Sequence, residues 1–229
     1  MSDRQRFFES VYANNLWASH ESRSGKGSEL EATAPLRQEL TAVLHYFGIR
    51  SMLDLPCGDF HWMQHVDLAG IRYIGADIVP DIVANNQQRF GNADRQFVHA
   101  DLVSGPLPKA DVVFCRDCMI HCTLELIQKS LQTLLTSGAT YVFLTHDNSL
   151  IRYLAHANCN VDLEPLENGV NYLYRTVNFT LPPFSFPPPL HFINEGFWDH
   201  CKTMALWRTD TLRQLLYKPQ LTTELPNPL

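Results

Sequence analysis

The stretch that decides the fold is Ser51-Met-Leu-Asp-Leu-Pro-Cys-Gly-Asp59, an apolar run that reaches an acid and then breaks into a tight turn. Such a run predicts the first strand of a doubly wound α/β sheet, with a ligand-binding turn at its carboxyl end. The turn carries two carboxylates, Asp54 and Asp59, where a dinucleotide-binding turn would offer glycine amides to a pyrophosphate. We therefore expect this turn to repel an anionic ligand and to attract a cationic one.

Two further predicted strands also end in an acid: residues 72–76 run into Asp77, and residues 96–100 run into Asp101. Asp77 lies 19 positions beyond Gly58, a spacing that brings a second-strand carboxylate to the ribose hydroxyls of an adenosine ligand. Asp101 could accept a hydrogen bond from an adenine amino group. Each acid taken alone could equally be a helix cap or a turn residue. Because the carboxyl ends of adjacent parallel strands form one edge, three such acids in succession indicate a binding site there.

The remaining apolar patterns predict a mostly parallel, seven-stranded, Rossmann-like sheet with an antiparallel last strand, and so an α/β fold. Further strands are expected at residues 110–115, 140–144, 170–181 and 203–208. Helices are expected at residues 4–14 with Asp3 as the cap, 35–47, 59–66 with Asp59 as the cap, 80–89, 124–136 with Thr123 as the cap, and 150–157.

Length and composition favour a single domain. With 229 residues, of which 45% are hydrophobic, the chain can bury a sizeable core but leaves little for a second domain. We divide residues 1–229 into an N-terminal helix and lid (1–35), an α/β core (36–208) and a C-terminal helix and tail (209–229).

Charge and hydropathy exclude some partners. A net charge of -6 offers no basic surface to nucleic acid. No apolar run approaches the length of a membrane span, and the first residues lack the apolar core of a signal peptide. We expect a cytoplasmic protein without a nucleic-acid or membrane partner, in which the six cysteines are reduced thiols.

Residues 21–28, Glu-Ser-Arg-Ser-Gly-Lys-Gly-Ser, are small and polar and precede the first core strand. Their composition alone favours a flexible surface linker. The alternative is a lid that folds over a ligand, in which the Arg23 guanidinium pairs with a ligand carboxylate as a fork.

Three cysteines and a histidine lie close together, at Cys115, Cys118, His121 and Cys122. Zinc sites usually pair two separated knuckles, and no second knuckle follows at a suitable spacing. Cys115 is expected at a strand end while its neighbours enter a turn, so the four side chains need not converge. We expect buried thiols and no metal.

The acidic turn, Asp77, Asp101 and the later strands together resemble class I S-adenosylmethionine (SAM)-dependent methyltransferases. The chain is more narrowly similar to a poorly characterised bacterial-type subgroup of that family, through Trp17 with residues 21–28, Leu53–Met63, Cys115–Cys118 and Pro183–Pro187. The resemblance covers about residues 36–208 and the lid, implies SAM as the cofactor, and fixes no acceptor. The residues expected to bind SAM are Trp17, Arg23, Asp54, Pro56, Gly58, Asp59, Asp77, Ile78, Asp101, Leu102 and Arg116.

The turn after the first strand departs from the usual methyltransferase pattern, acid-x-Gly-x-Gly-x-Gly. Only the middle glycine, Gly58, is kept, and Pro56 and Phe60 take the flanking positions. Proline removes a backbone donor, and phenylalanine prevents the close backbone approach that a glycine allows. We therefore expect a modified pocket for the amino-acid end of SAM, with Trp17 and Arg23 as candidates for holding the methionine part.

Methyl transfer is an in-line displacement, so the protein mainly aligns the acceptor, excludes water and, for a hydroxyl acceptor, removes a proton. Asp117, His121 and His146 are the candidate catalytic bases, and His121 is preferred because an imidazole pKa lies near working pH. The candidates for binding the acceptor are Arg175, Asn178 and Glu195. The later aromatic residues, Phe179, Phe184, Phe186, Phe192, Phe197 and Trp198, could wall in an acceptor or form a local core.

The sequence thus predicts transfer of a methyl group from SAM to a small-molecule or glycan-like acceptor, on oxygen or nitrogen rather than carbon. The alternative is a SAM-binding protein without transferase activity, acting as a sensor or scaffold. A nicotinamide-dependent oxidoreductase is disfavoured because the Gly-x-Gly-x-x-Gly pattern is absent and the acids oppose a pyrophosphate. The sequence does not fix the oligomeric state.

Overall fold

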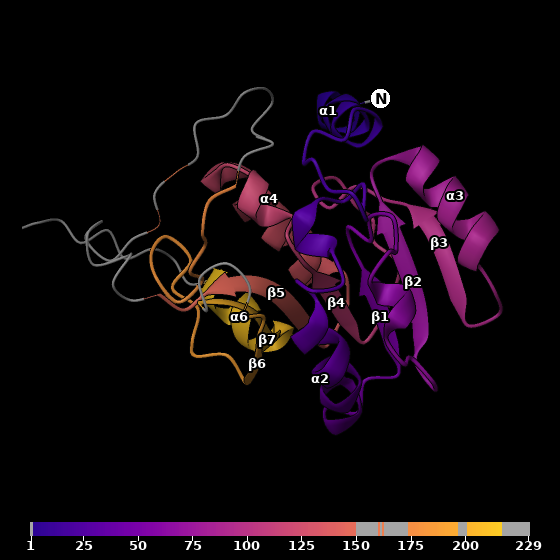
Figure 1. Ribbon diagram of the computed structural model, residues 1–229. Coiled ribbons are helices and arrows are strands. Elements are labelled where there is room, and N and C mark those ends of the chain that lie inside the picture. Colours follow the sequence, from indigo (N-terminus) through magenta and orange to yellow (C-terminus); the bar gives the residue numbers. More distant parts are fainter. Residues whose placement is uncertain (1, 150–159, 161, 163–173, 197–200, 217–229) are drawn as a thin grey trace, which may run out of the picture.

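The computed structural model describes residues 2–149, 160, 162, 174–196 and 201–216. Within them, seven strands form one sheet in the order β3-β2-β1-β4-β5-β7-β6 (Figure 1). The strands are β1 (Ser51–Asp54), β2 (Arg72–Asp77), β3 (Arg95–His99), β4 (Val112–Cys115), β5 (Tyr141–Asp147), β6 (His191–Asn194) and β7 (Lys202–Arg208).

The first five strands are parallel, and β1 lies in the interior of the sheet between β2 and β4. Strand β7 runs antiparallel to both β5 and β6. The chain winds outward from β1 in two directions, so the strand order reverses between β1 and β4, where such sheets bind ligands at the carboxyl ends of their strands. The predicted α/β fold, with an antiparallel last strand, is confirmed.

Five α-helices surround the sheet in the described residues: α1 (Asp3–Ala13), α2 (Ala34–Tyr46), α3 (Pro80–Phe90), α4 (Leu124–Thr136) and α6 (Thr209–Leu216). The Thr123 hydroxyl caps α4 by accepting from the Leu126 amide, as predicted. The predicted cap of α1 is wrong, because the Ser2 hydroxyl accepts from the Gln5 amide and Asp3 lies in the first turn. No helix in the described part of the chain is both long and apolar enough to span a bilayer.

Each face of the sheet has its own hydrophobic core. Alternate strand residues point to opposite faces, so Leu53 joins the core under α4 and α6 while Met52 joins the core under α2. Each fully buried aliphatic side chain contributes about 1.5–3 kcal/mol to folding. The α2 side of the core includes Leu36, Leu40 and Leu44, and the α4 side includes Ile127, Leu131 and Leu134, all nearly or fully inaccessible to solvent.

Two predicted elements are wrong. The helix expected at residues 59–66 is reduced to one 3-10 turn, Met63–His65, because the Asp59 carboxylate binds residues 22–24 and caps no helix. The strand expected at residues 170–181 is not a sheet strand in its described part, 174–181, and β6 takes its place. There the backbone turns, with the Leu181 carbonyl accepting from the Phe184 and Ser185 amides. The helix expected at 150–157, and Phe197 and Trp198, lie outside the described residues.

Candidate functional site

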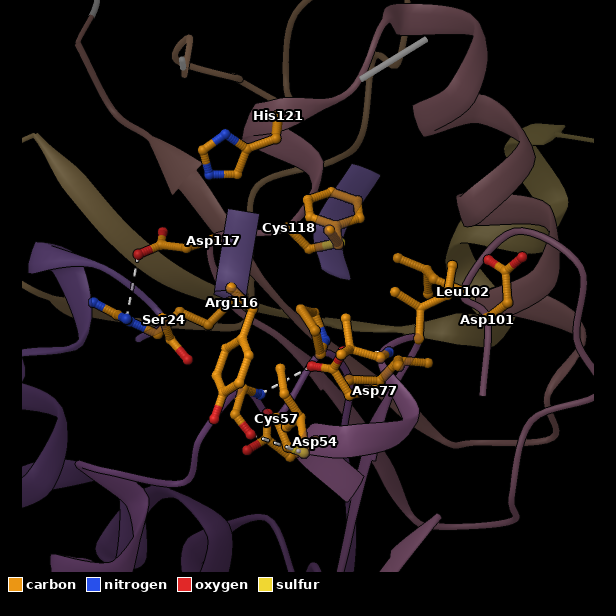
Figure 2. A pocket seen from close by; sticks show the side chains of 18 of the residues that line it. Ser24, Asp54, Cys57, Asp77, Asp101, Leu102, Arg116, Asp117, Cys118 and His121 are labelled. Carbon is orange, nitrogen blue, oxygen red and sulfur yellow. Dashed lines mark hydrogen bonds and ion pairs between the residues drawn. The ribbon is translucent and has the colours of Figure 1, made fainter. Parts of the chain in front are cut away.

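A cavity of about 1080 Å³ opens at the carboxyl edge of the sheet, where β1, β2, β3 and β4 end (Figure 2). We call it the first cavity. All the residues expected to bind SAM line it except Asp59. Figure 2 shows Asp54, Asp77 and Asp101 around the same space, with His121 on another side. The members of its wall that the sequence named are Trp17, Arg23, Asp54, Pro56, Gly58, Asp77, Ile78, Asp101, Leu102 and Arg116.

Asp54, at the end of β1, is a buried acid in the wall of the first cavity. Burial raises its pKa to about 7, although the Tyr73 hydroxyl, 2.6 Å away, and the Arg116 charge oppose the rise. A carboxylate in this state is poised between its neutral and ionised forms at physiological pH. A nearby cation would favour the ionised form.

Asp77, at the end of β2, is also buried beside the first cavity. It is held in place by the Val79 amide, 2.9 Å from Oδ1, and by the Gly58 amide, 3.1 Å from Oδ2. Burial raises the pKa of Asp77 to about 6, against the effect of these backbone donors. The Gly58 bond ties the turn after β1 to the end of β2.

Asp101 follows β3 and is partly buried. Its burial would raise the pKa, but hydrogen bonds from the Val103 amide, the Ser104 hydroxyl and Arg4 outweigh that effect and lower it. Arg4 Nη2 lies 2.6 Å from Asp101 Oδ2, an ion pair between α1 and the sheet edge.

Helix α1 forms part of the wall of the first cavity, a role that sequence reasoning missed. Arg4, Phe8 and Tyr12 all line the cavity. They are spaced four residues apart and therefore share one face of the helix. This four-residue spacing can be seen in the sequence, and it indicates that one face of α1 packs against another surface.

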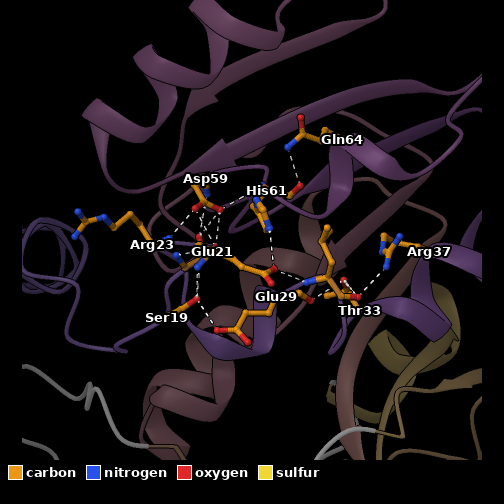
Figure 3. Close-up of polar contacts among 12 residues, drawn as sticks. Ser19, Glu21, Arg23, Glu29, Thr33, Arg37, Asp59, His61 and Gln64 are labelled. Carbon is orange, nitrogen blue, oxygen red and sulfur yellow. Dashed lines mark hydrogen bonds and ion pairs between the residues drawn. The ribbon is translucent and has the colours of Figure 1, made fainter.

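Residues 21–28, the segment expected to act as a lid and called the lid below, pack against the turn after β1, where Asp59 anchors them (Figure 3). The Asp59 carboxylate accepts from the Arg23 amide at 2.8 Å and from the Ser22 hydroxyl at 2.9 Å. The Ser24 hydroxyl donates to the same carboxylate at 3.2 Å and accepts from the Asp59 amide at 2.9 Å. Asp59 thus directs its charge at the lid rather than into the first cavity.

At Gly58, in the same turn, an added side chain would collide with the lid. The φ of Gly58 is +54°, a conformation that favours glycine, and a Cβ there would lie 2.2 Å from the Ser24 hydroxyl oxygen. The glycine therefore serves the packing of the lid onto the turn, which explains why it alone remains of the usual three.

A second cavity, of about 1090 Å³, lies beside the first. Its wall comes from the lid, the turn after β4, the end of β5, residues 174–177 and the start of β7, and it combines apolar surface with several charged side chains. The two cavities share four wall residues, which mark the junction between them: Trp17, Ser24, Asp117 and His121. The rings of Trp17 and His121 lie in contact there, with their centroids 5.2 Å apart.

Two of the three candidate bases are held in weakly basic states. Burial would raise the pKa of Asp117, but the nearby charges of Arg116 and Lys202 lower it to about 2, so this carboxylate stays ionised. Burial lowers the pKa of His146 to about 4. Its Nδ1 accepts from the Phe179 amide at 3.1 Å, which leaves the proton on Nε2. His121, like Asp117, lies at the junction, and it is buried against Trp17.

The three residues expected to bind the acceptor are not together. Arg175 lines the second cavity and donates to the Cys122 carbonyl at 3.1 Å. Asn178 lines neither cavity, because its carboxamide oxygen accepts from Thr180 and its backbone pairs with the Asn160 side chain. Glu195 also lines neither cavity and pairs with Arg116.

The described thiols give no metal centre. Among the described residues, no group of three or more His, Cys, Asp or Glu side chains could hold a metal ion. Cys118 and Cys122 line the first cavity. Contact with Cys115 raises the pKa of Cys118, contact with Cys118 raises that of Cys122, and burial adds to both effects.

Comparison with known proteins agrees with this geometry. Residues 53–143 match a family model described as a methyltransferase domain. No curated protein sequence matches the chain. Among solved structures, the methyltransferase domain of bacterial-CtHen1-CN is similar with a TM-score of 0.54 at 12% identity, over 77% of this chain and 99% of that one. A structure of PigF with SAH gives a TM-score of 0.53 at 14% identity, over 88% of this chain and 68% of that one.

Proposed function

We propose that this chain, a class I SAM-dependent methyltransferase with SAM as its cofactor, methylates an acceptor bound in the second cavity. The acceptor is a small molecule or a glycan-like compound, and the methylated atom is oxygen or nitrogen. The observation that carries this proposal is the junction, where Trp17, Ser24, Asp117 and His121 belong to both cavities. A donor in one cavity and an acceptor in the other would meet only there.

The acids that line the first cavity support SAM as its ligand. Asp54 and Asp77 supply carboxylates for the ammonium group and for the ribose hydroxyls, and their raised pKa values leave them able to ionise when a cation arrives. Ile78 and Leu102 provide apolar wall in the same cavity as the third acid, Asp101, and there an adenine ring would lie. The ten wall residues named from the sequence are proposed to hold SAM, and Asp59 is proposed to act on it through the lid.

The residues of the chain would align the reactants and exclude water. SAM supplies an electrophilic methyl carbon when it is bound. The lid and α1 cover the first cavity, and the Trp17 ring bounds the junction. For a hydroxyl or ammonium acceptor, His121 is proposed to take the proton, because Asp117 is paired with Lys202 and His146 already carries a proton on Nε2.

Calorimetry and a turnover assay test this function separately. Titration of the protein with S-adenosylhomocysteine (SAH) and SAM should show saturable binding, and mutation of Asp77 to Asn should weaken it. Incubation with SAM labelled in its methyl group, together with a panel of polar hydroxyl and amino compounds, should give a labelled product. An absence of SAH binding would refute the proposal.

A SAM-binding protein without transferase activity is the second candidate. The observation in its favour is that Asp117 and His146, two of the three candidate bases, are held in weakly basic states. This candidate predicts tight SAH binding and no labelled product from any acceptor, including carboxylates, which need no base.

A further inference from the structure

Glu195 follows β6 and lies between the two cavities without lining either of them. Its side chain is 0% exposed. Oε2 accepts from Arg116 Nε at 3.0 Å and lies 3.3 Å from Lys202 Nζ, so one oxygen serves two cations. A buried carboxylate is costly unless it is paired in this way.

Arg116 connects Glu195 to the lid. Its guanidinium lines the first cavity, lies 5.4 Å over the Trp62 ring and uses Nη2 to donate to the Gly27 carbonyl at 2.8 Å. Gly27 lies in the 3-10 turn Lys26–Ser28, the last part of the lid. Because the guanidinium is a rigid fork, fixing its Nε and Nη2 on Glu195 also fixes the direction of the bond to Gly27.

Lys202 connects Glu195 to the second cavity. It lines that cavity, and its Nζ lies 2.6 Å from Asp117 Oδ2. Arg116 Nη1 lies 3.2 Å from the same oxygen. Two cations and two carboxylates therefore alternate, and Asp117 is the member that belongs to the junction.

We propose that Glu195 is a positioning residue that holds Arg116 on the lid carbonyl and Lys202 on Asp117, so that lid closure and the shape of the junction depend on one buried carboxylate. Its effect on the reaction rests on the proposed function, whereas its effect on the lid does not. Without its negative charge, Arg116 and Lys202 share only Asp117. Arg116 then turns toward Asp117 and away from Gly27, and the second half of the lid loses its anchor.

The test compares two variants of the full chain that remove different members of the arrangement. Glu195→Gln keeps the size of the side chain and removes the charge that orients Arg116. Lys202→Met also disturbs the charge balance but leaves the contact between Arg116 and Gly27 in place. Asp210→Asn, which removes an exposed acid paired with Arg208, is the control for loss of a carboxylate elsewhere.

Two measurements report whether the lid stays attached to the rest of the structure. Hydrogen exchange of the peptide spanning residues 22–30, without ligand, should be faster in Glu195→Gln and close to wild type in Lys202→Met and Asp210→Asn. SAH release, followed by stopped-flow fluorescence, should be about tenfold faster in Glu195→Gln, equivalent to about 1.4 kcal/mol. Other peptides should exchange at unchanged rates, which a general loss of stability would not allow.

Equal lid exchange in Glu195→Gln and wild type, or equal acceleration in Glu195→Gln and Lys202→Met, would overturn the proposal. If Glu195→Gln fails to fold, Arg116→Lys serves instead, because a lysine keeps the charge but lacks the fork that spans Glu195 and Gly27. Failure of wild type to bind SAH would refute the proposed function, while the exchange of residues 22–30 would still decide the role of Glu195.

Discussion

The Tyr73 hydroxyl lies 2.6 Å from Asp54 Oδ2, and both side chains are buried at the base of the first cavity. Burial raises the pKa of Asp54 to about 7, and the Tyr73 hydrogen bond is the largest of the effects that oppose it. Asp77, with a pKa of about 6, lies on the same cavity wall. Both acids are therefore partly protonated near neutral pH when no cation is present.

SAM affinity should rise with pH from about 5.5 to 7.5 and then level, because cationic SAM favours ionised Asp54 and Asp77. If bound SAM lowers the pKa of Asp54 by one unit, the affinity changes about tenfold over this range. Calorimetry in buffers of different ionisation enthalpy would also count the protons released on binding.

Tyr73→Phe provides the matched variant for this pH dependence. Loss of the phenol donor should raise the pKa of Asp54 further, move the midpoint to higher pH and weaken SAM binding at pH 7. Tyr46→Phe, at an exposed tyrosine, should behave as wild type. A midpoint that is the same in Tyr73→Phe and wild type would show that Asp54 is not the titrating group.

Gly58→Ala should detach the lid. Both Gly58 and Gly70 have positive φ, so alanine costs about 1–2 kcal/mol of backbone energy at either position. Only at Gly58 does the new Cβ meet another group, the Ser24 hydroxyl, while nothing lies within 4 Å at Gly70. SAH binding should therefore weaken about tenfold in Gly58→Ala and remain near wild type in Gly70→Ala, about 1.4 kcal/mol apart. Similar SAH affinities in the two variants would contradict the packing argument.

Arg4→Ala should loosen α1 from the wall of the first cavity, because it removes the partner of Asp101. We expect SAH binding to weaken about fivefold, equivalent to about 1 kcal/mol for a partly exposed ion pair. Arg6→Ala is the control, since Arg6 pairs with the exposed Asp3 on the same helix and does not line the cavity. An equal effect of both substitutions would indicate a general effect on α1 rather than the contact with Asp101.

His146 should make stability depend on pH between about 4 and 6.5. Its folded pKa of about 4 lies below the ordinary value of 6.5, so the unfolded chain binds the extra proton in this window, and stability falls as pH decreases. His146→Asn keeps an acceptor for the Phe179 amide. In urea unfolding, its free energy of unfolding should change with pH over this window by up to about 3 kcal/mol less than that of wild type. Asp54 and Asp77 act in the opposite direction in both proteins, so the comparison isolates His146. His20→Asn, which replaces an exposed histidine, is the control for loss of an imidazole elsewhere.

His121→Asn should reduce turnover about 10²- to 10⁴-fold with any hydroxyl or amino acceptor that the panel yields, as expected for loss of a general base. SAH affinity should change far less. His146→Asn, in contrast, should retain most of the activity, because His146 Nδ1 already accepts from the Phe179 amide and therefore takes no proton. An equal loss of turnover in the two variants would remove the preference for His121.

The fold could be predicted from the sequence because its central strands are locally encoded. The run from Ser51 to Asp59 and the strands ending at Asp77 and Cys115 are continuous apolar segments that stop at turn residues. Such segments are typical of strands covered on both faces, and their strand parts are β1, β2 and β4 of the described sheet. In contrast, β6 has only four residues, His191–Asn194, with one buried side chain, too little pattern to outweigh the aromatic run before it.

The residues of the first cavity's wall that stand at strand ends could be predicted from the sequence. Those brought to the wall by long-range contacts could not. The three acids lie together because parallel strands end at one edge. The contact of Arg4 with Asp101 joins positions 97 apart, and no local pattern specifies it. Likewise, nothing in the sequence distinguishes a buried Glu195 from an exposed one. Whether the residues of the wall bind SAM, and whether His121 acts as the base, stay predictions.

The wall of the first cavity comes from two parts of the chain that are made at different times. Helix α1 and the lid end before residue 31, whereas the turns after β1 to β4 are complete only near Cys118. During translation, the ribosome therefore releases the cover well before the surface that it covers. A nascent chain shorter than this should be unable to retain the cofactor.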